Sequence, residues 1–220
     1  MNYTELSSAI QAYTENTETN FVAEIPVFVQ QAEQRIYNSV QFPSIRKNVT
    51  GTTTINNKYL QCPTDFLATY SLAVIDAAGA YEYLLNKDVN FIRQAYPTPA
   101  DTGTPKYYAL FGPRSDNAAE LTFILGPTPD AAYSSELHYY FYPPSITVSP
   151  YTSWLGDNFD TVLLYASLVE AYTYMKGETD MMALYNGKYQ EALALAKRLG
   201  DGLERGDAYR DGQTKIRVTT

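Results

Sequence analysis

The side chains that most often carry out chemistry are scarce in this sequence. It contains one histidine, His138, and one cysteine, Cys62. A nucleophile that needs a histidine base would have to use His138, but this residue lies in the aromatic stretch ELHYYFY and is interpreted as a structural strand residue. Cys62 precedes a proline in LQCPTDF, where a buried or half-buried structural thiol is the default interpretation. The sequence therefore indicates no nucleophilic active site.

The sequence gives no better support for a metal, nucleotide or acid–base site than for a nucleophilic one. Zinc requires about four Cys, His or acidic ligands, and one cysteine with one histidine does not supply a usual set. The chain has no GxxxxGKS/T or GxGxxG motif for phosphates. Glu178 and Asp180 are paired acids, but they flank a predicted helix start, where negative charge favours the helix dipole. We therefore predict a protein that is not an enzyme and that binds no metal or cofactor.

Charge and composition limit the remaining function classes. The composition is globular, with 45% hydrophobic and 18% charged residues, and the formal net charge is −8. An acidic folded body is unsuited to non-specific phosphate binding. The sequence has no long apolar run, and its first residues lack a basic start. We therefore expect no transmembrane helix, no membrane partner and no secretory signal.

Residues 205–220 differ from the acidic body, because they carry four basic and two acidic side chains. This arm is either a frayed terminus or a segment that docks on a partner. Its KIRVT stretch alternates as a strand does, so it could add to a sheet edge or lie in a groove of another chain. Docking is favoured because a solvated tail has no need of apolar side chains. The candidate partner-binding residues are Tyr209, Arg210, Lys215, Ile216, Arg217 and Val218.

Helical periodicity is found at both ends of the chain. Apolar residues recur at helical spacing over 3–14 and 25–40, where Pro26 suits a first helical turn. The helical period returns from Asp157. One helix is predicted to end near Gly177 and the next to begin at Thr179 or Asp180, so the two form an antiparallel hairpin.

Between these ends the pattern is that of strands. Asn56-Asn57 predicts a hairpin turn between β-prone flanks, and residues 88–96 predict a short helix that stops at Pro97. The predicted strands lie within 48–63, 66–75, 80–86, 106–112, 120–129 and 134–144.

This order of elements predicts an α+β fold. We expect a helical bundle of two N-terminal and two long C-terminal helices, with an inserted β-rich domain and an extended C-terminal tail. The predicted parts are residues 1–45 (first half of the helical part), 46–153 (β-rich domain), 154–204 (helical hairpin that completes the bundle) and 205–220 (arm).

Tyrosine is the outlier in composition, with 21 residues, and four aromatic residues are consecutive at 139–142. Successive side chains of a strand point to opposite faces, so both faces of this strand carry rings before Pro143-Pro144 end it. One face suits the domain's own core, and the other suits a neighbouring element of this chain or of another subunit. The candidate subunit-interface residues are Tyr139, Tyr140, Phe141 and Tyr142.

Several segments, taken in order, resemble the adaptor proteins of tailed-bacteriophage head-to-tail connectors, also called tail tubular protein A-like or gatekeeper-adaptor proteins. The resemblance covers most of residues 21–200. It rests on Leu-x-x-Pro-x-Asp-Phe at 60–66, Gly-x-Pro-x-Tyr-Tyr at 103–108, Pro-x-Pro followed by Tyr and Leu-x-Tyr-Tyr at 127–140, and the helical segment after them.

The resemblance implies a structural virion protein that is assembled in the host cytoplasm. Such adaptors form a dodecameric ring beneath the portal protein, extend the DNA channel and present a platform to the next tail component, a nozzle or tail tube protein. Genomic DNA would pass through the lumen without sequence-specific binding. The resemblance provides no catalytic residues, and it makes the arm a candidate portal contact.

Two other function classes remain open. The surplus of tyrosine suggests a carbohydrate- or receptor-binding tail module, because aromatic faces stack on sugars. An acid-pair hydrolase is the third class, although no acid pair lies in a recognisable nucleophile or metal context.

Overall fold

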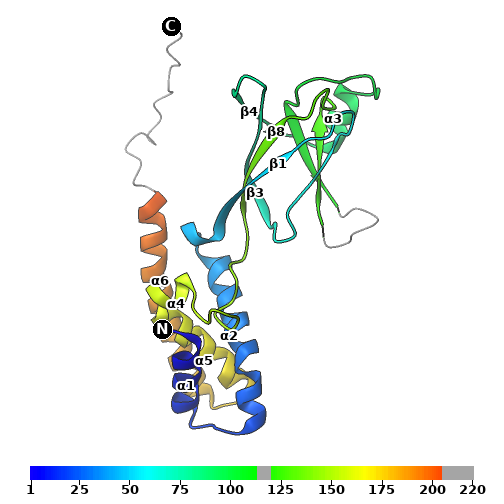
Figure 1. The fold of residues 1–220 in the computed structure, drawn as a ribbon. Helices are drawn as coiled ribbons and strands as arrows, with labels where there is room; N and C mark the ends of the chain where they lie inside the picture. Colours follow the sequence, from blue (N-terminus) through cyan, green and yellow to red (C-terminus); the bar gives the residue numbers. More distant parts are fainter. Residues whose placement is uncertain (113–119, 205–220) are drawn as a thin grey trace. The chain divides into compact units, whose positions relative to one another are not determined.

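The chain folds into two compact units (Figure 1). The computed structural model describes residues 1–112 and 120–204, with side chains described up to residue 198. The helical unit comprises Met1–Ile45 and the chain from Pro143 onward, and the β unit comprises Arg46–Tyr142. Residues 143–153, which the sequence groups with the strands, thus cluster with the helices. The four-part division made from the sequence remains a prediction.

Five α-helices build the helical unit within the described residues. Their ends follow local capping: Asn2 accepts a hydrogen bond from the N–H of Glu5 while Glu5 accepts one from Asn2, and Ser153 accepts one from Gly156. The helices are α1 (Tyr3–Thr14), α2 (Thr19–Ser39), α4 (Trp154–Asn158), α5 (Asp160–Met175) and α6 (Thr179–Glu204), and a 3₁₀ turn spans Pro43–Ile45.

Helix α5 is the central helix of this unit, with α1, α2 and α6 packed against it (Figure 1). Its sequence is apolar on nearly all sides, as expected for a helix that is buried against several neighbours. Glu170 on α5 forms a salt bridge with Arg35 on α2. The buried residues of α5 are Val162, Leu163, Leu164, Ala166, Ser167, Leu168 and Ala171.

Two four-stranded sheets build the β unit. The first sheet has the order β1 (Arg46–Thr52), β8 (Ser134–Tyr140), β3 (Ala68–Ile75) and β4 (Tyr81–Tyr83), and all of its pairs are antiparallel. The second has the order β2 (Tyr59–Gln61), β7 (Thr122–Gly126), β6 (Tyr107–Phe111) and β5 (Leu85–Asn86), with β5 parallel to β6.

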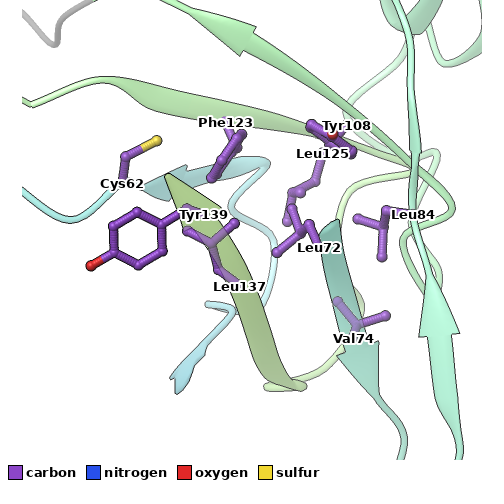
Figure 2. Close-up of a cluster of buried hydrophobic side chains, with 9 residues drawn as sticks. All are labelled: Cys62, Leu72, Val74, Leu84, Tyr108, Phe123, Leu125, Leu137 and Tyr139. Atoms are coloured by element: carbon purple, nitrogen blue, oxygen red, sulfur yellow. The ribbon is translucent and has the colours of Figure 1, made fainter. Parts of the chain in front are cut away.

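The two sheets share one hydrophobic core (Figure 2). Leu137 and Tyr139 of β8 point into it, as do Phe123 and Leu125 of β7. The opposite face of the second sheet is covered by α3 (Val89–Ala95), whose Ile92 packs against β6 and β7. The β unit is therefore a sandwich with a helix on one outer face.

The fold class predicted from the sequence is wrong. The described residues form six α-helices and two sheets, and they do not show a helical bundle completed by two long C-terminal helices. The hydrophobic periodicity of the sequence does not reveal two features of this fold. Phe159 leaves helical geometry (φ −139°, ψ 45°) and separates α4 from α5, and alternation along a strand does not reveal which strands share a sheet.

The hairpin predicted at Asn56-Asn57 is also wrong. Asn56 does take a positive φ of 58°, but β1 pairs with β8 and β2 pairs with β7. This turn therefore carries the chain from one sheet to the other. The predicted strand at 80–86 is likewise divided between β4 and β5, which belong to different sheets.

Helix α2 begins at Thr19, so Pro26 lies inside the helix and not in its first turn. An internal proline removes a backbone hydrogen bond and costs ~3 kcal/mol or more. Buried Phe21, Ile25 and Val29 lie on either side of it, and their burial offsets this cost. None of the helices in the described chain is long and apolar enough to cross a membrane.

Glu33 of α2 is a buried carboxyl that holds the chain where it returns from the β unit. Its side chain is 4% exposed, and its Oε1 accepts a hydrogen bond from the N–H of Ile146 at 3.0 Å. Burial raises the pKa of Glu33, while the hydrogen bonds from Ile146 and Ser145 oppose that rise. The contact joins α2 to the segment that follows Pro143-Pro144.

We expect Glu33→Ala to lower the free energy of unfolding by about 1–3 kcal/mol, because the buried N–H of Ile146 loses its acceptor. Glu33→Gln keeps an acceptor oxygen and is the matched control. Since folding raises the pKa of Glu33 above its ordinary value of 4.5, the wild type should be more stable relative to Glu33→Gln at about pH 4 than at about pH 8. Urea unfolding at both pH values measures this difference, and parallel pH profiles would contradict it.

Candidate interaction surfaces

His138 lies on the outer face of the first sheet, on the side opposite the shared core. Its Nε2 is 2.8 Å from Oε1 of Glu136 on the same strand. The Tyr81 hydroxyl also hydrogen-bonds Glu136, and this bond raises the pKa of Tyr81. The histidine is thus part of a surface hydrogen-bonded group on β8, and its interpretation as a structural strand residue remains a prediction.

Cys62 is a buried thiol, as the sequence indicates. Its side chain is 4% exposed and packs into the core between the sheets (Figure 2). Burial raises the pKa of the thiol to about 12. It is therefore protonated at neutral pH, whereas a nucleophile or metal ligand needs the thiolate.

A metal or acid–base site would need acidic side chains that are clustered in a suitable geometry. Across residues 1–112 and 120–204, no group of three or more His, Cys, Asp or Glu side chains is arranged to hold a metal ion. A wide polar cleft of about 710 Å³ in the β unit contains Glu82, Asp101 and Lys106. These three groups are of mixed charge, and the arrangement does not single out an acid–base pair.

Tyr139 lies in the core of its own subunit. It is 1% exposed, and its hydroxyl donates a hydrogen bond to Oδ1 of Asp65 at 2.8 Å. The other oxygen of Asp65 is 2.8 Å from Nζ of Lys47, on β1. Burial opposes the charge of Asp65, but the hydrogen bonds from Lys47 and Tyr139 lower its pKa overall.

The other three residues of the aromatic run are partly or largely exposed. Tyr140 lies on the outer face, where its ring meets Tyr70 edge-on at 6.0 Å and Arg46 lies over both rings. Phe141 packs beside the ring of Tyr139, and Tyr142 is 37% exposed. The role of the four residues in a subunit interface remains a prediction, and their alternation across the strand agrees with the two-faced pattern read from the sequence.

The outer face of the first sheet carries aromatic residues that the sequence reasoning missed. Tyr70, Tyr81 and Tyr83 are each more than half exposed. Tyr81 and Tyr83 lie on the same side of β4, with ring centroids 6.3 Å apart and nearly parallel planes. The alternation in Tyr81-Glu82-Tyr83 was the available signal, because residues two apart on a strand share a face. We call Tyr70, Tyr81, Tyr83 and Tyr140 the tyrosine face.

The predicted partner-binding residues of the arm lie outside the described residues, so their role remains a prediction. They are Tyr209, Arg210, Lys215, Ile216, Arg217 and Val218.

A sheet surface rich in exposed tyrosine is typical of a protein that binds other proteins, since tyrosine combines a large apolar ring with a polar tip. The comparison with known families agrees with this class. A sequence model of the SU10 adaptor protein family matches residues 1–215, and the chain belongs to that family. No curated protein matches the sequence.

This membership confirms the resemblance to phage head-to-tail adaptors that the sequence motifs indicated. The protein is a structural adaptor of a bacteriophage, a component of the virion that interacts with other head or tail proteins. Because the family is structural, it also supports the expectation that the protein is not an enzyme.

We expect Tyr139→Phe to lower the free energy of unfolding by about 1–3 kcal/mol, because the ring stays in place but the charged Asp65 loses a hydrogen-bond donor. Tyr59→Phe, which removes a hydroxyl from a side chain that is 49% exposed, is the matched control and should change stability less. Denaturant unfolding at neutral pH measures both variants. A loss in Tyr59→Phe as large as that in Tyr139→Phe would contradict the proposed role of the hydrogen bond between Tyr139 and Asp65.

Proposed function

We propose that the protein forms the adaptor ring of a phage head-to-tail connector, which joins the portal to the tail and extends the DNA channel. The observation that carries this proposal is membership of the SU10 adaptor family over residues 1–215. In this proposal the ring is a dodecamer. One side of it binds the portal protein, and the other binds the next tail component, a nozzle or tail tube protein.

The charge of the chain supports a channel through which DNA passes freely. The formal net charge is −8. Each fixed basic group that binds a DNA phosphate adds affinity that depends on salt. An acidic channel wall would therefore hold few phosphates and release the genome without sequence-specific contacts.

The tyrosine face supports self-association into a ring. It belongs to the first sheet, and no helix of the described β unit packs extensively on that sheet, whereas α3 covers the outer side of the second sheet. Each tyrosine side chain can bury roughly 150–250 Å², so the four together could form the centre of a subunit contact. A ring then requires a head-to-tail contact in which the rotation from one subunit to the next returns to the first subunit.

A carbohydrate- or receptor-binding role is the second candidate. The observation that favours it is the pair Tyr81 and Tyr83, whose exposed rings lie nearly parallel at 25° beside Glu136. Parallel exposed rings next to a hydrogen-bonding carboxylate are suited to stacking on a sugar. If this face is buried between subunits, it cannot serve that role.

Co-expression with the cognate portal protein tests the connector assignment. We expect a complex in which a closed ring of this chain lies on the portal, with its lumen continuous with the portal channel, and cryo-EM of the purified complex would show it. If the chain fails to associate with the portal and occurs elsewhere in the virion, the connector assignment is wrong.

Replacing Tyr70 and Tyr83 together by serine should weaken self-association by at least about tenfold, because aromatic anchors dominate interface energies. Both side chains are exposed, so the fold should be retained. Tyr59→Ser is the matched control, since Tyr59 is 49% exposed on the other sheet. Sedimentation velocity measures the association, and equal effects of the two changes would show that the tyrosine face is not the contact.

A further inference from the structure

A cleft of about 260 Å³ opens at the side of the β unit, between β1 of the first sheet and the β2 region of the second. Phe123 and Leu137 in its wall also belong to the core between the sheets, where Figure 2 shows their side chains. The cleft therefore borders that core. We call it the edge cleft. Its apolar lining residues are Val49, Leu60, Cys62, Pro63, Phe123 and Leu137.

The edge cleft exists because β1 places little side-chain volume over the core. Val49 and Gly51 pair with Leu137 and Ser135, so they lie on the core side of the strand. Val49 is 38% exposed, and Gly51 has no side chain, although a Cβ there would lie 3.2 Å from Oγ of Ser135. The layer between the sheets is thus incompletely filled along this edge.

Strand β1 also has one side free for pairing within the described chain. Its seven residues pair with β8 on one side, and it is the end strand of the sheet order. An open edge of this length is a template for an added strand. A peptide that pairs with β1 would direct alternate side chains into the edge cleft.

We propose that residues 214–219 of the arm of a second copy add to β1 and fill the edge cleft. This segment, TKIRVT, has branched apolar side chains at Ile216 and Val218, two residues apart. Those two side chains enter the cleft, where the exposed Val49 offers a cross-strand partner. Lys215 and Arg217 then point away from the core, where charged side chains prevent further strands from adding.

The arm is long enough to reach a neighbouring subunit. Sixteen residues follow the end of α6 at Glu204, and a fully extended chain of that length spans roughly 50 Å. The choice of a second copy as donor rests on the proposed ring, in which every subunit offers one arm and one cleft. Such an exchange is a head-to-tail contact and can close a ring.

Paired cysteines test this contact in the full chain. In a Cys62→Ala background, Val49→Cys is combined with Ile216→Cys or with Val218→Cys, and the matched controls combine it with Lys215→Cys or with Arg217→Cys. We expect one of the first pairs to form a disulfide between two chains about tenfold faster than either control, because only alternate residues of a strand face the cleft. Mild oxidation followed by non-reducing electrophoresis measures the rate.

Three outcomes would overturn the proposal: equal rates for the two sets, disulfides formed within one chain, or disulfides that form no faster than between unassociated chains. A second measurement needs no cysteine. Deleting residues 207–220 should speed hydrogen exchange of the β1 amides in the assembled protein, and unchanged exchange would also overturn the proposal.

The same deletion also tests whether the arm binds the portal protein. If the deletion leaves self-association intact and weakens only portal binding, the arm binds the portal and the assignment to a second copy is wrong. If a ring forms on the portal but the expected disulfides do not form, only the proposed contact between the arm and β1 is wrong. If the disulfides form but the protein does not bind the portal, only the proposed connector function is wrong.

Discussion

The two-residue period of strand β8 is the constraint on which the β unit depends. One side of the strand presents Leu137 and Tyr139 to the core, and the other presents His138 and Tyr140 to the outer face. Because β8 lies between β1 and β3, it sets the register of both neighbours. A shift by one residue would move the polar side chains into the core and the apolar ones out of it.

A polar contact inside this arrangement ties the edge strand to the core. A buried tyrosine needs a partner for its hydroxyl, and Tyr139 finds one in Asp65, which precedes β3. Asp65 in turn pairs with Lys47 of β1. The lysine is largely exposed, so its ion pair contributes little by itself. The group of three nevertheless fixes the start of β1 beside the core, while the far part of the same strand borders the edge cleft.

The sequence predicted what depends on local pattern and missed what depends on pairing. It placed a short helix at 88–96 and the helix break near Gly177, because Pro97 and the loss of apolar periodicity mark these ends. It predicted a buried or half-buried structural thiol at Cys62, because a free cysteine is among the most buried residue types. It could not tell that the turn at Asn56 joins two sheets, because turn chemistry does not identify a strand's partner.

The candidate surfaces also fall into those that the sequence predicted and those that it missed. The run at 139–142 was visible because its rings are consecutive. Tyr70, Tyr81 and Tyr83 come from two strands and meet only after β3 pairs with β4. The edge cleft had no signal in the sequence, because it results from Val49 and Gly51 of β1 lying opposite residues of the other sheet. Surfaces made by pairing become predictable only when the sheet order is known.

An assembling subunit must keep its contact surfaces soluble until a partner covers them, and the composition of the tyrosine face suits that need. Four leucines in the same places would form a patch that favours non-specific association. Tyrosine hydroxyls stay hydrated while the rings remain available for burial. The edge of β1 has a similar balance, since Val49 is the only apolar side chain that this strand exposes beside the edge cleft. Both surfaces can thus stay hydrated before assembly at a low cost in free energy. Their burial by another subunit would still stabilise the assembly.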